Sequence, residues 1–455
     1  MSKNTISRRD FLSNSALAGI GIGSTLGMGG LLSSCGKSGE SSAKLTPLIP
    51  ESEWNIQQYL PDKAKDSAPL KAGLIGCGNR GTGAAQDLLT AAPNVSFVAL
   101  GDLFSDRLES SRKILKEKFN QDIPDANCFT GFDSYEKVLA AGVDLVLLAT
   151  PPAFRYIHFK AAVEAGKHAF LEKPVAVDPV GARSIIATSR QAFSKGLVVV
   201  TGTQRHHQRM YIEGYKQIQK GLIGEIVSAN IYWNTGKHWL RTKEKQWTDI
   251  EWMIRDWGNW CWLSGDHIVE QHVHNIDVIN WFLGKNPIRA SGMGAHQRRL
   301  TGDQYDMFSV DFVYDDDIHV NSMCRQIDGC SNNIAEVIRG TQGTWSNNGE
   351  IKDRKGNIIW KYDMEKEKAE FKQTNEFVLE HVNFINHILD KKPLNLAEAT
   401  AISTLTAIMG RMSAYTGEDV TWDQIMASDL SLFPDNLSLS NVDMSNFTIP
   451  IPGKP

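Results

Sequence analysis

Short hydrophobic runs alternate with amphipathic stretches through the first half of the chain. The run KAGLIG leads into CGNRGTGAAQDLL, VSFVALGD follows, and VDLVLLATPP is apolar at nearly every position. Continuous apolar runs of this kind are typical of parallel strands buried on both faces, and the stretches between them have helical length. HAFLEKPVAV and GLVVVTGTQ extend the alternation. The pattern predicts a doubly wound parallel sheet, a Rossmann domain, over residues 71–204.

The first strand-to-helix turn has three glycines at the spacing of a dinucleotide-binding loop. Gly76, Gly78 and Gly81 form GxGxxG. Such glycines permit the tight turn, the approach of the backbone to a pyrophosphate and close packing of helix on strand, and the helix N-terminus favours the anion. We expect Asn79 and Arg80, which lie within this loop, to contact the cofactor too.

The residue that ends the second predicted strand bears on the choice between NAD and NADP. Asp102 lies 21 residues after Gly81, where an acid would accept a hydrogen bond from a ribose 2′-hydroxyl and repel a 2′-phosphate. This position favours NAD as the cofactor. Arg107 is close enough in sequence to keep NADP open.

Composition and length narrow the class of protein. At 455 residues and 50.5 kDa the chain is long enough for two domains. A net charge of −4 provides no broad basic field, so we expect no nucleic-acid partner. Many of the 12 tryptophans lie between Trp233 and Trp281, and aromatic walls of this kind either stack on sugar rings or fill a core.

The N-terminal residues 1–35 resemble an export signal. Arg8 and Arg9 precede the apolar run ALAGIGIGSTLGMGGLL, as in twin-arginine signals, and LLSSC resembles a lipobox that ends at Cys35. Residues 36–70 have the composition of a polar linker. We expect an exported protein, periplasmic or anchored to a membrane only through a lipid on Cys35.

Four motifs together resemble one known family. GxGxxG, ATPP, AGKH and EKP, at this spacing within residues 70–420, resemble the glucose–fructose oxidoreductase/inositol dehydrogenase (Gfo/Idh/MocA) superfamily. The resemblance implies that residues 205–375 form an α/β domain with a large, open, mostly antiparallel sheet. Helical periodicity and composition predict terminal helices and a tail over residues 376–455. The resemblance also implies cofactor contacts from Thr150, Pro151, Glu172 and Lys173.

The segment GDHIVEQHVHNIDVINW, residues 265–281, has the family's catalytic pattern on a predicted helix. The resemblance implies that Lys173 lies beside the nicotinamide and that Glu270 and His274, four residues apart, face it from one side of this helix. His274 would be the general base, Lys173 would orient the alcohol, and Glu270 would orient His274 or bind a hydroxyl. The spacing also puts His267 on that face, so a metal site with Glu270 and His274 stays open, although we expect no metal.

Other polar and aromatic residues are candidates for binding a polyhydroxylated substrate. Each of them could also be an ordinary core or surface residue, as we expect for Asp277. The candidates are Arg205, His206, Trp233, His238, Arg255 and His267.

These features predict an NAD(P)-dependent oxidoreductase that acts on a hydroxyl of a sugar, glycoside or cyclitol. An exported enzyme has no free NAD pool around it, so we expect the cofactor to stay tightly bound. Two alternatives remain: a redox-neutral NAD-dependent glycosidase, and a non-catalytic lipoprotein that binds a nucleotide or sugar. We expect a homo-oligomer in either case.

Overall fold

A six-stranded, all-parallel sheet forms the N-terminal half of the computed structural model, which describes residues 61–454. The strand order β3-β2-β1-β4-β5-β6 is that of a doubly wound fold, and the predicted Rossmann domain is confirmed. The strands are β1 (Leu70–Ile75), β2 (Val95–Asp102), β3 (Cys128–Thr130), β4 (Leu145–Leu148), β5 (His168–Leu171) and β6 (Val199–Thr201).

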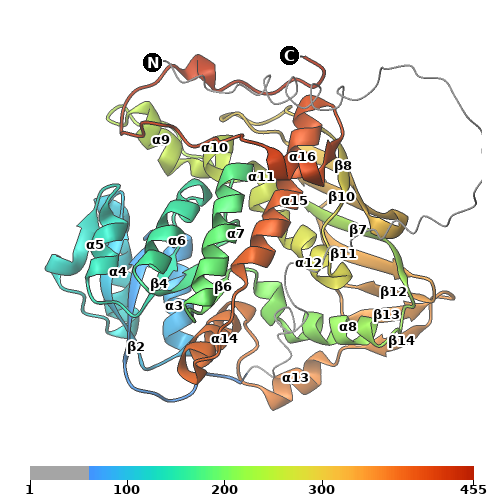
Figure 1. Ribbon diagram of the computed structural model, residues 1–455, viewed down its shortest axis with the longest axis horizontal. Coiled ribbons are helices and arrows are strands. Elements are labelled where there is room, and N and C mark those ends of the chain that lie inside the picture. Colours follow the sequence, from blue (N-terminus) through green and yellow to red (C-terminus); the bar gives the residue numbers. More distant parts are fainter. Residues whose placement is uncertain (1–60, 455) are drawn as a thin grey trace, which may run out of the picture.

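Helices cover both faces of this sheet because its strands are apolar on both sides. One face packs on α3 (Asn79–Ala91) and α4 (Ser105–Phe119), and the other on α5 (Ser134–Ala140), α6 (Arg155–Glu164) and α7 (Pro179–Ser194). Helix α14 (Glu376–Asp390) comes from the far end of the chain and lies beside α3 (Figure 1). Its Phe384 and Ile385 join the core of the first face.

The second domain is built on a nine-stranded sheet in the order β14-β13-β12-β11-β7-β10-β9-β8-β15. Every neighbouring pair is antiparallel except β7 and β10, so the predicted mostly antiparallel sheet is confirmed. The strands are β7 (Ile226–Thr235), β8 (Arg289–Ala295), β9 (Met307–Tyr314), β10 (Ile318–Gln326), β11 (Asn333–Gly340), β12 (Gly343–Ser346), β13 (Glu350–Asp353), β14 (Ile358–Lys361) and β15 (Val420–Thr421).

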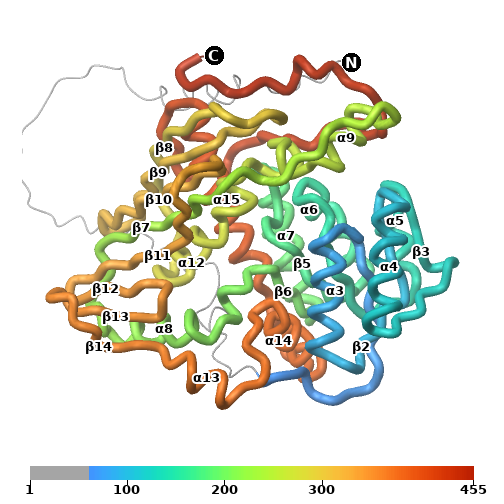
Figure 2. The backbone as a smooth tube through the Cα atoms, turned by 180° about the vertical axis from the view of Figure 1, so that it is seen from behind, coloured from blue at the N-terminus to red at the C-terminus, as the bar shows by residue number. Residues whose placement is uncertain are grey.

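Long helices cover one face of this second sheet. Helices α8 (Arg209–Gln219), α12 (Val273–Leu283) and α15 (Ala397–Thr416) fill that side, and α15 also packs along α7, so it joins the two domains (Figures 1 and 2). The opposite face exposes Met293 and Met323 on both sides of Ser309.

Short helices complete the described chain. They are α9 (Asp249–Arg255), α10 (Cys261–Ser264), α11 (His267–Glu270), α13 (Met364–Glu370) and α16 (Trp422–Ala427), with 3₁₀ turns η1 (Asp125–Asn127), η2 (Pro152–Phe154), η3 (Gln204–His207), η4 (Trp257–Asn259), η5 (Asp315–Asp317) and η6 (Met444–Asn446). Between residues 61 and 454, none of the helices has the length and apolar character that a membrane span requires.

The last residues of the chain run along α9 instead of forming a loose tail. Ile250 N donates to Ser440 O at 3.1 Å, and Val442 N donates to an Asp249 carboxylate oxygen at 3.2 Å. The segment passes along the upper edge of the molecule in both views (Figures 1 and 2). The sequence had given no signal for this packing.

Candidate functional site

The glycine loop has no room for side chains at two of its three glycines. Gly76 has φ 97°, and a Cβ there would lie 2.6 Å from the backbone nitrogen of Thr150. A Cβ on Gly81 would lie 1.8 Å from the carbonyl oxygen of Gly76. Helix α3 begins at Asn79, directly after Gly78, so its free N–H groups lie at the loop as a dinucleotide phosphate requires.

A pocket of about 670 Å³ opens beside this loop at the carboxyl ends of the strands. Its lining includes five of the predicted cofactor residues: Gly76, Gly78, Asp102, Thr150 and Pro151. The sequence pattern does not reveal the apolar part of the wall, which is formed by Phe104, Phe132, Phe154, Ile254 and Trp257, with His158 among them. Phe104 and Phe132 follow the ends of β2 and β3, a position that could have indicated them.

Asp102 and Arg107 both line this pocket. The Asp102 carboxylate accepts hydrogen bonds from the backbone N–H groups of Cys77, at 2.6 Å, and Phe104, at 2.9 Å. Burial raises the pKa of Asp102, and these hydrogen bonds oppose that rise. Burial and the charge of Arg241 lower the pKa of Arg107. An acceptor for a ribose hydroxyl and a half-buried cation therefore share one pocket.

Arg80 and Glu172 form an ion cluster behind the loop, away from the pocket wall. Arg80 Nε lies 2.5 Å from Glu172, and its other nitrogens lie 3.2 Å from Glu380 and 3.3 Å from Asp87. These ion pairs fix α3 and α14 to the end of β5, and contacts of Arg80 and Glu172 with a cofactor stay a prediction.

The second domain roofs the pocket through α9 and η4. Ile254 and Trp257 line the pocket, and Arg255 makes a two-pronged ion pair with Asp106 at 3.0 Å while lying 3.8 Å above the Phe104 ring. Arg255, predicted for the substrate, therefore lies on the cofactor side.

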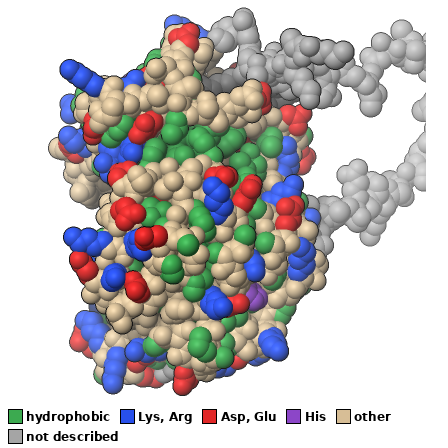
Figure 3. Space-filling view, turned by 90° about the vertical axis from the view of Figure 1, so that its left-hand side faces the viewer, with side chains coloured by type: hydrophobic (Ala, Val, Ile, Leu, Met, Phe, Trp, Pro, Cys, Tyr) green, Lys and Arg blue, Asp and Glu red, His purple; other side chains and the backbone are tan. Residues whose placement is uncertain are grey.

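The apolar cluster around this roof extends onto the outer surface. The cluster includes Phe433 and Phe447 of the C-terminal segment. Figure 3 shows hydrophobic side chains gathered in a recess on this side of the molecule.

Lys173 joins the two domains at the second part of the site. It follows β5, and its Nζ donates to Glu270 Oε1 at 2.9 Å and to the Glu270 carbonyl at 2.6 Å. Glu270 Oε2 also accepts a hydrogen bond from Gln271. Burial would raise the pKa of Glu270, but the charges of Lys173 and His238 and these hydrogen bonds lower it overall.

The expected single helix over residues 265–281 is wrong in one respect, because it breaks after Glu270. The structure has α11 and α12, and His274 N donates to Gln271 O at 3.4 Å instead of to the Glu270 carbonyl. The Glu270 carbonyl accepts a hydrogen bond from Lys173 Nζ at this position, where the regular helical hydrogen bond is absent.

His274 lies on the first turn of α12, close to Lys173 and Arg205. Its ring stacks on Trp233 with centroids 5.6 Å apart. Burial, followed by the charges of Lys173 and Arg205, lowers its pKa well below the ordinary value. The imidazole is therefore neutral near pH 7 and able to accept a proton.

The other predicted substrate residues divide into two groups. Arg205 is ion-paired with buried Glu336 at 2.5 Å, and His206 lies 2.7 Å from Asp277 and stacks on Trp281, so both are engaged inside the second domain. Asp277 also accepts a hydrogen bond from Ser403, in keeping with a structural role. His238 and His267 lie near Glu270. His267 is at the other end of α11 from Glu270, and the charge of Glu270 opposes the lowering of the His238 pKa by burial.

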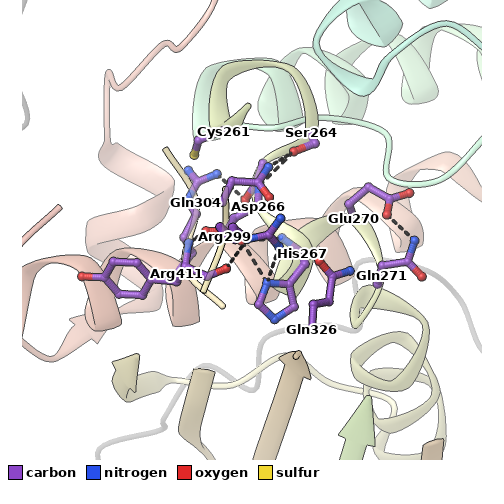
Figure 4. A network of polar contacts seen from close by, with 12 residues as sticks. Cys261, Ser264, Asp266, His267, Glu270, Gln271, Arg299, Gln304, Gln326 and Arg411 are labelled. Atoms are coloured by element: carbon purple, nitrogen blue, oxygen red, sulfur yellow. Dashed lines mark hydrogen bonds and ion pairs between the residues drawn. The ribbon is translucent and has the colours of Figure 1, made fainter. Parts of the chain in front are cut away.

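His267 belongs to a polar network that supports α11 (Figure 4). Its Nδ1 lies 3.0 Å from Asp266 and 3.5 Å from an Arg299 nitrogen, while Glu270 lies apart from this cluster in Figure 4. Across residues 61–454, no three His, Cys, Asp or Glu side chains are grouped to hold a metal ion.

Comparison with known families agrees with this architecture. The description "Oxidoreductase family, NAD-binding Rossmann fold" matches residues 70–203, and "Oxidoreductase family, C-terminal alpha/beta domain" matches residues 215–421. The chain therefore belongs to the Gfo/Idh/MocA oxidoreductase family, and its N-terminal domain is an NAD-binding Rossmann domain.

Two curated relatives resemble parts of the chain. The scyllo-inositol 2-dehydrogenase (NAD(+)) of Bacillus subtilis is 24% identical over 226 residues, which are 50% of this chain and 57% of the relative. A glycosyl hydrolase family 109 protein of Streptomyces coelicolor is 30% identical over 165 residues, 35% of this chain and 33% of the relative. The chain thus spans about half or less of each relative's length.

A solved structure shares the fold over most of the chain. The scyllo-inositol dehydrogenase of Lactobacillus casei, solved with NAD(H) and scyllo-inositol, superposes with a TM-score of 0.58 at 20% identity. The match covers 78% of this chain and 99% of that one.

Proposed function

We propose that the protein is an NAD-dependent oxidoreductase that oxidises a secondary hydroxyl of a sugar, glycoside or cyclitol. The main support is the contact of Lys173, at the end of β5, with Glu270 at 2.9 Å, next to a neutral His274. A cation and a proton acceptor thus meet where the NAD-binding domain joins the second domain. The dehydrogenase among the relatives supports the same class of reaction.

The residues of the pocket fit the cofactor. The glycine loop has no space for side chains at Gly76 and Gly81, and the half-buried Asp102 carboxylate lines the pocket, as an adenosine ribose requires. Gly78 and the start of α3 would hold the pyrophosphate. When bound, NAD supplies the acceptor for the hydride that leaves the carbinol carbon.

Side chains of the protein accept the hydroxyl proton and stabilise the negative charge of the alkoxide. A ring nitrogen of His274 accepts the hydroxyl proton, and the ammonium of Lys173 stabilises the alkoxide that forms as this proton leaves. Glu270 fixes Lys173 through two hydrogen bonds, one to its carboxylate and one to its carbonyl. Trp233, which stacks on His274, offers an aromatic face to the sugar ring.

A redox-neutral glycosidase is the second candidate, favoured by the relative named as a family 109 glycosyl hydrolase. In that reaction a ring carbon is oxidised for a time, which acidifies the neighbouring C–H and permits elimination of the aglycone. Water then adds and the ketone is reduced again, so no net oxidation occurs. The same Lys173 and His274 would serve both schemes.

One experiment separates these candidates. Purified protein is incubated with aryl glycosides and free sugars without added NAD, and reduced cofactor, keto-sugar and aglycone are followed together. Keto-sugar that forms only with a carbonyl acceptor supports the oxidoreductase, and aglycone release without keto-sugar supports the glycosidase. A protein that binds nucleotide and sugar but converts neither would be the non-catalytic lipoprotein.

We also propose that the protein is an exported lipoprotein. Its support is the sequence alone, since Arg8, Arg9 and Cys35 lie outside the described residues. Changing both arginines to lysine should leave precursor in the cytoplasm, and Cys35→Ser should release the protein from membranes. Normal membrane tethering of both variants would contradict this proposal.

We further propose a homo-oligomer. The exposed face of the second sheet, with Met293 and Met323, offers a surface for a second copy. Light scattering of the purified protein should give a mass above that of one chain, and a monomer at micromolar concentration would contradict it.

A further inference from the structure

A second pocket lies in the second domain, next to the Lys173 centre. It has a volume of about 670 Å³, and loops 237–240 and 298–306 and the end of β10 form its walls. His238 and Arg299 line it. Arg299 lies 3.5 Å from His267, which begins α11, the short helix that ends at Glu270. The pocket is therefore adjacent to the centre where the reacting hydroxyl would bind.

The pocket wall is held in a fixed shape. Arg299 donates hydrogen bonds to Asn259 Oδ1 at 3.1 Å, to the Tyr305 carbonyl at 2.8 Å and to Gln326 (Figure 4). Gly302 has φ 84°, and a Cβ there would lie 1.7 Å from the Asn259 carbonyl oxygen, so only glycine lets this loop lie against η4. The wall is thus preformed rather than adaptable.

Three buried polar atoms of this wall have no partner within residues 61–454: Asp306 Oδ1, Thr301 Oγ1 and His238 Nε2. Asp306 is 1% exposed, and its Oδ2 accepts the backbone N–H groups of Gln297 and Arg298, while Oδ1 accepts nothing. Thr301 Oγ1 is likewise buried without a partner. An unsatisfied buried polar group costs about 1–3 kcal/mol, so a ligand with hydroxyl donors would be stabilised here.

The rim of the pocket carries aliphatic side chains beside the exposed charged residues Lys237, Arg298 and Asp328. Leu240 is 39% and Leu300 is 83% exposed, and both belong to the lining. Hydroxyl acceptors inside and aliphatic groups at the rim match the two surfaces of a sugar ring, whose edge donates hydrogen bonds and whose C–H face is apolar.

We propose that this pocket binds a second sugar unit of the substrate. The oxidised ring would lie at Lys173 and His274, and the ring linked to it would donate hydroxyl hydrogen bonds to Asp306 and Thr301. The preferred substrate is then a glycoside of at least two sugar units rather than a free monosaccharide or cyclitol. This inference rests on the proposed function for the position of the first ring.

The test is calorimetric binding to the cofactor-loaded protein. Matched probes are methyl β-D-glucopyranoside with cellobiose, methyl α-D-glucopyranoside with maltose, and methyl N-acetyl-β-D-glucosaminide with chitobiose. At least one disaccharide should bind about tenfold tighter than its methyl glycoside, the effect of one well-placed charged hydrogen bond. Asp306→Asn and Thr301→Val should remove most of that difference and leave methyl glycoside binding unchanged.

The exposed Asp317→Asn variant is the matched control and should bind like the wild type. The proposal would be overturned if each disaccharide bound with the same affinity as its methyl glycoside, or if no probe bound. It would also be overturned if the Asp306 and Thr301 variants lost equal affinity for both sizes of ligand. If thermal unfolding shows that the Asp306→Asn variant is not folded, the Thr301→Val variant alone tests the proposal. Because binding is measured without turnover, a failure to oxidise these sugars would count against the proposed function and leave this result intact.

Discussion

At the scale of single residues, one contact explains both a structural irregularity and the proposed chemistry. Lys173 donates a hydrogen bond to the Glu270 carbonyl. At that residue the helix that the hydrophobic pattern of residues 265–281 predicts is interrupted. The pair could be predicted from motif resemblance, but the break could not, because periodicity does not reveal a competing donor from another domain. Arg205 and His206 show the same limit, since their buried partners Glu336 and Asp277 are remote in sequence.

The role of Asp102 gives a prediction at this scale. Asp102→Ala removes the carboxylate from the cofactor pocket, so NAD affinity should fall about tenfold or more, while NADP affinity should fall less because a repulsive charge is also lost. Titration calorimetry of the nucleotide-free protein measures both. Asp122→Ala, in the exposed loop that follows α4, is the control. Equal losses for the two nucleotides would refute the assignment.

At the scale of elements, the regular strands and helices of the Rossmann domain could be predicted and the roof of its pocket could not. Apolar runs identify β1, β2, β4, β5 and β6 because parallel strands are buried on both faces. Helix α9 and the C-terminal segment have no such periodicity, and their packing depends on contacts such as that of Trp260 with Phe447, at 5.7 Å.

This roof should hold the cofactor. Trp257 lines the pocket from the second domain, and removal of a partly buried aromatic ring in Trp257→Ala should cost about 1–2 kcal/mol, or roughly tenfold in NAD affinity. Stopped-flow dissociation should show a faster off-rate. Trp360→Ala, on edge strand β14, removes a similarly placed ring far from the pocket and should not change the rate. An unchanged rate in Trp257→Ala would show that the roof does not retain the cofactor.

At the scale of the whole molecule, buried histidines should make the free energy of unfolding depend on pH. Burial lowers the pKa values of His158, His207 and His272 to about 3, and those of His274 and His381 fall well below 6.5. The unfolded chain then binds more protons than the folded one below pH about 6.5. The stabilisation of the folded state by these neutral histidines is complete above that pH. It is lost as the pH falls, by up to about 1.4 kcal/mol per pH unit for each histidine.

Urea unfolding between about pH 7.5 and pH 5.5 tests this sign. Buried acids with raised pKa values, such as Glu380, act in the opposite direction within this window, so the difference between the wild type and a histidine variant is the quantity that isolates the histidine contribution. His272→Gln should reduce the loss of stability by about one histidine's share. Exposed His319, whose pKa Asp311 raises, is the control, and His319→Gln should leave the fall in place. A His272→Gln variant that loses as much stability towards pH 5.5 as the wild type would contradict the assignment.

The central claim is that Lys173 and its partners promote hydride removal from a sugar hydroxyl carbon. The most direct measurement is a single turnover of NAD⁺-loaded protein mixed with a glycoside, followed by the absorbance of the reduced cofactor. The wild type should show reduction that slows when the carbinol hydrogen is deuterium. Lys173→Met should lose at least about a hundredfold in this rate with the cofactor still bound, and exposed Lys160→Met should not. Reduction in Lys173→Met at the wild-type rate, or a rate without an isotope effect, would contradict the account.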